Sequence, residues 1–381
     1  MPSRYAAFIF TVALLIAAWA ILEAQQRGGG PAGLPGAGRG GGPQPPVGSM
    51  PSRRFEKITE GVYYVTSTGS MSVGSNAVVI VNDQDALLID PGETPATASA
   101  FIEDIKTITN KPVKFVVDSH YHFDHAHGNQ IFGPDVTVIG HDRTYDMLAG
   151  SPLRGQAYVT QAAPDLLQQR LDTMKSQVAT TAEPEARAQL ERQILATQLR
   201  IVQEQAIKPT PPNTTFSQRM TLHRGSREIQ ILYFGRSHTD TDIVVLLPQE
   251  RIACTGDMME SQLSYAADAW VNEWPDTLEK LTALDFDTVL PGHGAPFKGK
   301  DKIRAFQSYL RDFYKQVMTL RQQGLSVEDA AKRVDLMSHA ADWPQIRAAG
   351  ADLRAVQRMY DLAANPNAPL RSLNSVQYPS K

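Results

Sequence analysis

The sequence predicts a layered α/β fold in which helices cover both faces of β-sheet material. Short apolar stretches rich in β-branched residues alternate with helical stretches in one block and, after a purely helical insert, again in a second block. The chain has 381 residues, enough for one sizeable core or for a core with a smaller appended unit. Hydrophobic residues make up 42% of it and charged residues 20%, values that are ordinary for a soluble globular protein.

The folded part is expected to begin at Phe55. Runs that are short, apolar and bounded by turn residues predict strands over residues 62–65, 77–81, 86–89, 113–117 and 136–139, with helices over 96–109 and 143–149. Strands resume from Phe216. They are clearest over residues 228–233, 243–247, 251–254 and 288–290, and a helix is expected over 278–284.

Residues 164–207 have a helical pattern throughout, and Pro184 divides them into two helices. Leu190, Ile194 and Ile201 recur along one face. We interpret this segment as a helical hairpin inserted into the domain. Its apolar stripe either packs against the host domain or a partner subunit, which is compatible with a homodimer, or forms a lid over an active site.

A C-terminal helical extension is expected over residues 299–364. Its first helix carries an amphipathic stripe that includes Ile303, Phe306 and Leu310 and ends near Gly324. Ser326 and Asp329 resemble a capping box that opens a second helix. The last helix is expected over residues 351–363, and residues 365–381 are predicted to be a disordered tail.

The first 54 residues are expected to lie outside the fold. Arg4 precedes an uncharged apolar run over residues 6–22, and Ala24 suits a signal-peptidase site, so residues 1–24 are predicted to be a signal peptide. The alternative is an uncleaved membrane anchor, since the run is near the shortest length that spans a bilayer. Residues 25–54 are rich in Gly and Pro and predict a disordered linker. We therefore expect export to the periplasm or the extracellular space, with no stable membrane span after cleavage.

Charge and cysteine content exclude two classes of protein. The net charge is −3 and no basic segment is present, which argues against a nucleic-acid partner and favours a small-molecule substrate. Cys254 is the only cysteine, so an intramolecular disulfide is excluded. It lies within a predicted strand, where we expect it to be buried and inert.

Four metal-ligand candidates follow the predicted strand 113–117 directly. They are His120, His122, Asp124 and His125. Imidazole and carboxylate are ligand types that suit zinc and iron. Because residues i and i+2 point the same way in an extended chain, His120 and His122 can share one metal, while Asp124 and His125 can address a second.

Three further candidates each follow a short apolar strand in a Gly-containing loop. His238 lies in GRSHTDTD, Asp257 in TGD and His293 in PGHG. Strands of one sheet deliver their ends to a common rim, so we expect these loops to converge on the first four candidates. The sequence therefore predicts a metal centre.

This series of motifs resembles the metallo-β-lactamase superfamily over roughly residues 55–298. The pattern H-x-H-x-D-H, a distant His, an Asp in TGD and a His in PGHG carry the resemblance, and LIDPG around Asp90 matches another motif of the superfamily. The implied fold is a four-layer αββα sandwich with the metals at one sheet edge. The helical hairpin and the C-terminal helices are additions to it.

The resemblance also implies roles for individual residues. Two Zn²⁺ ions are implied, with iron or manganese as alternatives, and Asp90 supports the ligand loop. Two dications that share a water lower its pKa from about 15.7 to about 7, and the resulting hydroxide attacks the substrate while Asp124 orients it or shuttles a proton. The implied ligands are His120, His122 and His238 for the first metal, Asp124, His125 and His293 for the second, and Asp257 as the bridge.

Two departures narrow the function. An Asp at the position of Asp257 resembles the pattern of glyoxalase II, lactonases and phosphodiesterase-like members of the superfamily. True metallo-β-lactamases usually have Cys or Ser at this position. His122 stands where di-iron oxidoreductases carry Glu, which disfavours a redox di-iron role. The spacing of GRSHTDTDIVVLLP and TGDMM also resembles exported members associated with quinoproteins.

We therefore expect a zinc-dependent hydrolase that acts on a small ester, lactone, thioester or amide. The alternatives are β-lactam hydrolysis, a non-hydrolytic metal-binding accessory role and a mono-iron, sulfur-oxidising enzyme. Around the centre, Tyr121 and Phe123 are expected to support the ligand loop. His127 is either a core residue or a support for a ligand, and Asp242 is a candidate for hydrogen bonding within the His238 loop.

Overall fold

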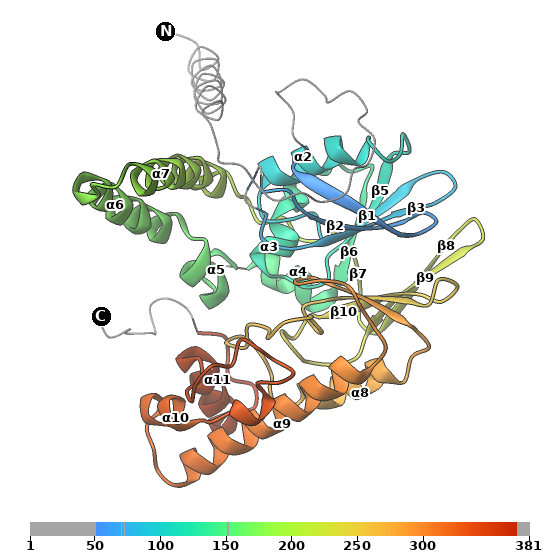
Figure 1. The fold of residues 1–381 in the computed structure, drawn as a ribbon. Helices are drawn as coiled ribbons and strands as arrows, with labels where there is room; N and C mark the ends of the chain where they lie inside the picture. The colour runs from blue at the N-terminus through green and yellow to red at the C-terminus, as the bar shows by residue number, and fades with distance from the viewer. Residues whose placement is uncertain (1–50, 70, 72, 151, 372–381) are drawn as a thin grey trace, which may run out of the picture. The chain divides into compact units, whose positions relative to one another are not determined.

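The computed structural model describes residues 51–69, 71, 73–150 and 152–371 (Figure 1). The predicted signal peptide, nearly all of the predicted linker and the end of the predicted tail lie outside these residues. Within the described ranges, no helix is both long enough and apolar enough to cross a membrane.

Two β-sheets face one another in the centre of the fold (Figure 1). The first has the strand order β1-β2-β3-β4-β5-β6-β7, and the second β13-β12-β11-β10-β9-β8. The strands of the first sheet are β1 (Arg53–Thr59), β2 (Val62–Ser67), β3 (Ala77–Val81), β4 (Ala86–Ile89), β5 (Val113–Val117), β6 (Thr137–His141) and β7 (Thr214–Phe216). Those of the second are β8 (Arg219–Arg224), β9 (Arg227–Tyr233), β10 (Ile243–Leu247), β11 (Ile252–Gly256), β12 (Thr288–Pro291) and β13 (Phe297–Lys298).

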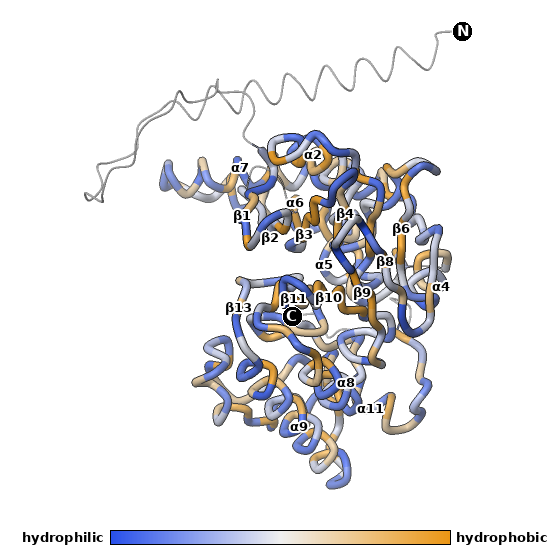
Figure 2. The backbone as a smooth tube through the Cα atoms, turned by 90° about the vertical axis from the view of Figure 1, so that its right-hand side faces the viewer, coloured by the Kyte–Doolittle hydropathy of each residue, from blue (hydrophilic) through white to orange (hydrophobic). Residues whose placement is uncertain are grey.

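Apolar side chains fill the space between the sheets and also cover their outer faces. Val78 and Ile80 of β3 share the inner core with Ile231 of β9 and Val245 of β10. Val79, the residue between them, belongs instead to the outer core beneath α2, since successive strand residues point to opposite faces. Figure 2 accordingly shows hydrophobic stretches along the central strands. These strands read as continuous apolar runs because both faces of each sheet are covered.

Helices form the two outer layers. The helix α2 (Pro95–Ile105) covers the first sheet through Phe101 and Ile105. The second sheet is covered by α8 (Trp274–Thr282) and α9 (Asp301–Gln322), whose Trp274 and Phe306 rings meet edge to face at 5.1 Å. The predicted αββα sandwich is confirmed.

The topology brings the motif loops to one edge. Strands β4, β5 and β6 are parallel, as are β11 and β12, so each set has its carboxyl ends on the same side. Two backbone hydrogen bonds join the sheets at this edge, one from Ile243 N to Ser119 O at 2.9 Å and one from Asn76 N to Gly292 O at 2.7 Å. The segments after β4, β5, β11 and β12 therefore meet there.

The helical insert lies between β6 and β7. It comprises α4 (Asp142–Ala149), the 3₁₀ turn η2 (Pro152–Arg154), α5 (Gln156–Gln161) and a hairpin formed by α6 (Pro164–Thr180) and α7 (Pro184–Gln205). Pro184 takes the first position of α7, where its missing N–H leaves no hydrogen bond unmade. Inside the hairpin, Leu167, Leu171 and Ile201 form a small buried cluster.

Some element boundaries differ from those predicted. Strand β1 begins at Arg53, ahead of Phe55, and the buried Arg53 side chain lies over the Phe101 ring at 4.6 Å. The helix predicted over 278–284 begins at Trp274, which is fully buried and followed by Pro275 in the first turn.

The C-terminal extension continues with α10 (Val327–Arg333), η3 (Met337–His339) and α11 (Leu353–Ala364). Ser326 caps α10 by accepting a hydrogen bond from Asp329 N at 3.1 Å, as expected. Residues 365–371, the start of the predicted tail, are held against α11. Arg371 pairs with Asp361, and Arg358 Nη1 donates to Ala368 O at 2.8 Å.

Candidate metal centre

The H-x-H-x-D-H segment leaves β5 and turns at once into the short helix α3 (Phe123–Ala126). Its entry is fixed by Asp90, whose carboxylate accepts hydrogen bonds from Ser119 N at 2.7 Å and Ser119 Oγ at 2.8 Å. Asp90 has a φ of 62°, a left-handed backbone conformation that non-glycine residues seldom adopt. Such strain persists where the surrounding structure over-determines it, as at functional sites.

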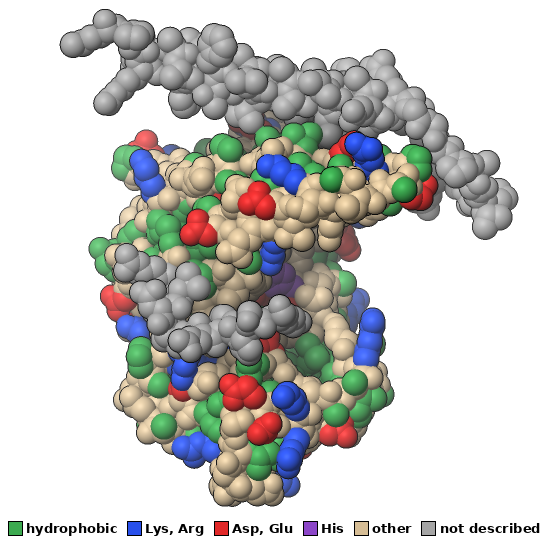
Figure 3. All heavy atoms as spheres, turned by 90° about the vertical axis from the view of Figure 1, so that its left-hand side faces the viewer, with side chains coloured by type: hydrophobic (Ala, Val, Ile, Leu, Met, Phe, Trp, Pro, Cys, Tyr) green, Lys and Arg blue, Asp and Glu red, His purple; other side chains and the backbone are tan. Residues whose placement is uncertain are grey.

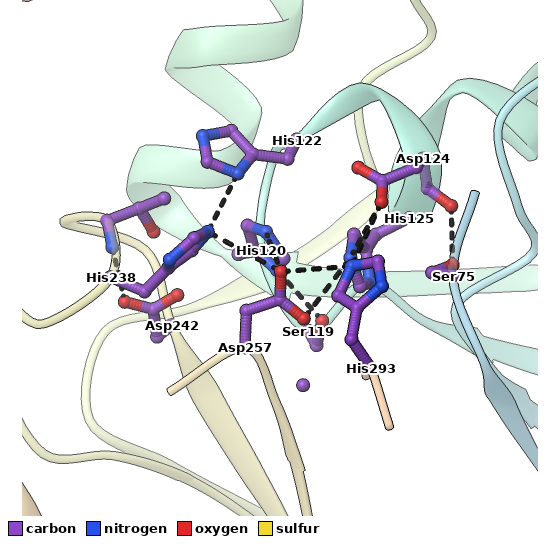
Figure 4. A network of polar contacts seen from close by, with 12 residues as sticks. Ser75, Ser119, His120, His122, Asp124, His125, His238, Asp242, Asp257 and His293 are labelled. Atoms are coloured by element: carbon purple, nitrogen blue, oxygen red, sulfur yellow. Dashed lines mark hydrogen bonds and ion pairs between the residues drawn. The ribbon is translucent and has the colours of Figure 1, made fainter. Parts of the chain in front are cut away.

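The first group of ligand candidates consists of His120, His122 and His238. All three are buried, and one ring nitrogen of each lies within 4.8 Å of the others. His238 Nε2 and His122 Nδ1 face each other at 2.9 Å (Figure 4). The three rings come from two different sheets, since His238 lies in the loop between β9 and β10.

The second group consists of Asp124, His125 and His293, whose ligand atoms also lie within 4.8 Å of one another. Asp124 Oδ2 is 3.1 Å from His293 Nε2 and 3.5 Å from His125 Nε2. His293 is the most exposed of the three, with 24% of its side chain accessible. On the face shown in Figure 3, histidine colour is visible inside a hollow.

Asp257 lies between the two groups (Figure 4). Its Oδ1 is 3.4 Å from His125 Nε2, and its Oδ2 is 3.5 Å from His238 Nε2 and 3.3 Å from His293 Nε2. One carboxylate therefore reaches ligand candidates of both groups. The structure thus brings all seven predicted ligand residues together, and bridging of two metals by Asp257 stays a prediction.

Three outer groups fix the orientation of the imidazoles. Asp90 Oδ2 lies 2.8 Å from His125 Nδ1, and Ser119 Oγ lies 3.0 Å from His120 Nδ1. Asp268 Oδ2 lies 3.1 Å from His122 Nε2. Each contact occupies one ring nitrogen and turns the other toward the centre, which is the usual arrangement around metal-binding histidines.

These residues fit divalent metal ions. His120 Nε2, His125 Nε2 and Asp257 Oδ1 are buried atoms without a hydrogen-bond partner in the described structure, although buried polar atoms are nearly always satisfied. Gly292 leaves room for the Asp257 carboxylate, since a Cβ on Gly292 would lie 2.2 Å from Asp257 Oδ1. Nitrogen and carboxylate donors at this spacing suit zinc, iron or manganese.

The pKa shifts of the imidazoles differ between the two groups of ligand candidates. Burial lowers the pKa of His238 to about 3 and the pKa of His120 well below its ordinary value. Burial opposes ionisation of Asp257, but His293 and His125 hold the pKa of its carboxyl well below the usual range. Burial opposes protonation of His125 and His293, but Asp257 and Asp124 raise the pKa of both imidazoles well above the ordinary value. Because neutral imidazole and ionised carboxylate are the forms that bind metals, a metal ion at the second group would displace protons from these two rings.

The remaining predictions concern residues around the centre. Tyr121 and Phe123 are buried beside the ligand loop. The predicted role of Asp242 is confirmed, since its Oδ2 accepts hydrogen bonds from Ser237 Oγ at 2.7 Å and Thr239 N at 2.6 Å in the His238 loop. His127 is buried against Tyr158, with ring centroids 5.5 Å apart.

Cys254 is buried, as predicted, and burial raises the pKa of its thiol well above the ordinary value. The uncharged thiol is a poor nucleophile.

Two carboxylates at the centre were not predicted. Asp268 holds His122, and Glu260 forms a buried group with His238 and Asp257 in which the ligand atoms lie within 4.8 Å of one another. Burial raises the pKa of Glu260 to about 8. Both residues lie in the loop that follows Asp257. The sequence of that loop contains no motif that marks Glu260 or Asp268, so their place beside the ligand candidates is visible only in the folded structure.

The sandwich and this site define an αββα protein with a candidate metal centre at one edge of its sheets. The chain belongs to the metallo-beta-lactamase superfamily, whose sequence profile matches residues 72–293.

Among characterised relatives, the linear primary-alkylsulfatase of a Pseudomonas species is 25% identical over 280 residues, covering 68% of this chain and 50% of the relative. The type 2 metallo-beta-lactamase of Bacillus cereus is 37% identical over 79 residues, covering 19% of this chain and 31% of the relative. The chain therefore spans half or less of the length of these relatives. A metallo-beta-lactamase structure from Pontibacter korlensis aligns with a TM-score of 0.48 and 19% identity over 68% of this chain and 99% of that one.

Proposed function

We propose that this protein is an exported hydrolase with two metal ions that cleaves a small ester, lactone, thioester or amide. The convergence of seven ligand residues, with Asp257 in reach of both groups, is the observation that carries the proposal. Export is supported by the apolar run and small residues at the start of the sequence.

His120, His122 and His238 would hold one ion, Asp124, His125 and His293 the other, and Asp257 would bridge them. Zinc is the ion we propose, since imidazole and carboxylate both bind it, with iron or manganese as the alternatives. Bound at these positions, the ions supply a water of lowered pKa and polarise the bond to be cleaved.

The protein side chains supply orientation and proton transfer. Asp124 lies near the open side of the centre, with 12% of its side chain exposed, and Oδ2 faces His293. We assign Asp124 to orient the attacking water or to shuttle a proton. Asp90, Ser119 and Asp268 keep the imidazoles in place during turnover.

A sulfate ester is the second candidate substrate. The match to the alkylsulfatase extends over 280 residues, whereas the match to the B. cereus β-lactamase covers 79, and this favours an ester over a β-lactam. A sulfate ester carries the same kind of polarised, oxygen-linked leaving group as the carboxylic esters. β-Lactam hydrolysis remains the alternative to test beside it.

The test is a substrate panel assayed with zinc-reconstituted protein. The panel contains a carboxylic ester, a lactone, a thioester, a primary alkyl sulfate, a β-lactam and a phosphodiester. We expect turnover of one ester class, its loss in His120→Ala and its retention in His223→Ala, which removes an exposed histidine of β8. A protein that binds metal fully but cleaves none of these, or one that holds a single iron and consumes oxygen, would contradict the proposal.

A further inference from the structure

A buried ionic network joins the helical hairpin to the body of the fold. Arg200 of α7 makes a two-point contact with Glu93, Nη1 to Oε1 at 3.1 Å and Nη2 to Oε2 at 3.2 Å. Its Nη2 also lies 3.3 Å from Glu204 Oε1. The Glu93 side chain is 1% exposed and that of Arg200 20%. Two-point arginine–carboxylate pairs of this kind fix orientation as well as distance.

Glu93 lies directly beside the metal-ligand segment. A Cβ on Gly74 would lie 2.3 Å from Asp124 Cβ and 2.6 Å from Glu93 Oε2. The Gly74 backbone therefore lies between the side chains of Asp124 and Glu93. The loop that carries Glu93 also contacts the ligand helix α3, because Gly92 N donates a hydrogen bond to His125 O at 3.2 Å. A displacement of Glu93 therefore reaches both Asp124 and His125.

The residues that flank the hairpin, in α5 and just after α7, make a second, apolar contact with the metal-ligand segment. Tyr158 and Val159 of α5 and Ile207, just after α7, pack against Phe123. Phe123 stands between His122 and Asp124, and its ring centroid is 5.8 Å from that of Tyr158. The chain thus contacts the ligand segment on both sides of the hairpin, before α6 begins and after α7 ends.

We propose that the inserted hairpin positions the second metal group and that Arg200 is the positioning residue that acts through Glu93. Arg200 acts without touching a reacting atom: it holds Glu93 against Gly74 and thereby fixes the place of Asp124. This inference rests on the proposed two-metal centre. It gives the hairpin a role at the base of the site, different from that of a lid or of a dimer contact alone.

The test is Co²⁺ titration of the metal-free full-length protein, followed by visible absorption and by chelator competition. In Arg200→Ala we expect one of the two Co²⁺ ions to bind more weakly, by up to about 10-fold, the loss that follows removal of a direct outer partner of a metal ligand. We also expect the absorption bands of that ion to change. Arg200→Lys, which keeps the charge but loses the two-point contact, should be intermediate. The matched control is Arg187→Ala, which removes an exposed arginine of the same helix and should leave both ions unchanged.

The outcomes separate this inference from the proposed function. Two Co²⁺ ions with the same affinities and spectra in wild type, Arg200→Lys and Arg200→Ala would overturn the positioning role and leave the two-metal centre standing. A lower melting temperature without any change in Co²⁺ binding would overturn it as well. A wild-type protein that binds no Co²⁺ overturns both. If Arg200→Ala does not fold, Arg200→Lys decides.

Discussion

Two buried polar clusters lie close together in this protein, and they are built on opposite principles. At the metal centre, imidazoles and carboxylates face one another, as His125 Nε2 and Asp257 Oδ1 do at 3.4 Å. In the network of the hairpin, Glu93 and Glu204 face the guanidinium of Arg200. Burying a charge without a partner is costly. The network contains a permanently charged guanidinium, whereas at the centre we propose that bound metal ions supply positive charge.

The largest expected effect comes from removing the residue that reaches both metal groups. Asp257→Asn keeps the shape of the side chain but removes its charge. Since loss of an outer partner already costs about 10–100-fold, we expect loss of this ligand to lower kcat/KM by more than about 100-fold. The measurement is steady-state hydrolysis of the best substrate of the panel. The control is Asp135→Asn, at an exposed position, and equal activity in the two variants would refute the bridging role.

Removal of metal is expected to destabilise the centre but leave the hairpin network intact. A ligand present at about 100 times its Kd stabilises a protein by about 2.7 kcal/mol, so a strong chelator should lower Tm by about 5 °C or more. Differential scanning calorimetry with and without chelator measures this shift. His120→Ala should show a smaller shift, and an unchanged wild-type Tm after complete metal removal would contradict the comparison.

Asp268→Asn tests the support of His122. The carboxylate lies 3.1 Å from His122 Nε2, and an amide there interacts more weakly with the ring. We expect metal affinity to fall about 10-fold to 100-fold. Competition with a chromogenic chelator measures it, beside Asp276→Asn at an exposed position of α8. Equal affinities would show that Asp268 does not support the centre.

The smallest effect concerns pH and the hairpin network. Burial raises the pKa of Glu204 to about 8 from its ordinary 4.5. Because the pKa of Glu204 is raised in the folded state, its contribution to the free energy of unfolding is fully present below pH 4.5. That contribution is lost as the pH rises through about 8. Glu204→Gln should therefore match wild type near the acidic end and exceed its Tm by a few degrees at alkaline pH. Thermal melts across this window test it, with Glu191→Gln as the exposed control; a gap that is constant with pH would contradict it.

The sequence predicted which residues the structure brings together at this edge, because each signal lies in a short stretch of chain. His120, His122, Asp124 and His125 share one short segment after an apolar strand, and His238, Asp257 and His293 each follow a strand that ends at the same edge. The layered fold followed from the alternation of strands and helices. In both cases the pattern within a short stretch of chain carries the information.

The supporting contacts could not be predicted, because they join distant parts of the chain. Asp268 is 146 positions from His122, and Arg200 is 107 from Glu93. Neither pair has a motif, and each depends on how a loop or helix packs after folding. The start of β1 at Arg53 could not be predicted for the same reason, since burial of Arg53 depends on its contact with the distant Phe101 ring.

The most direct test of the account is the metal content of the zinc-reconstituted full-length protein, measured by mass spectrometry after removal of unbound ions. We predict two zinc ions per chain in wild type and fewer than two in Asp257→Asn. A wild-type protein that holds one ion or none, although its fold is intact by circular dichroism, would contradict the two-metal centre.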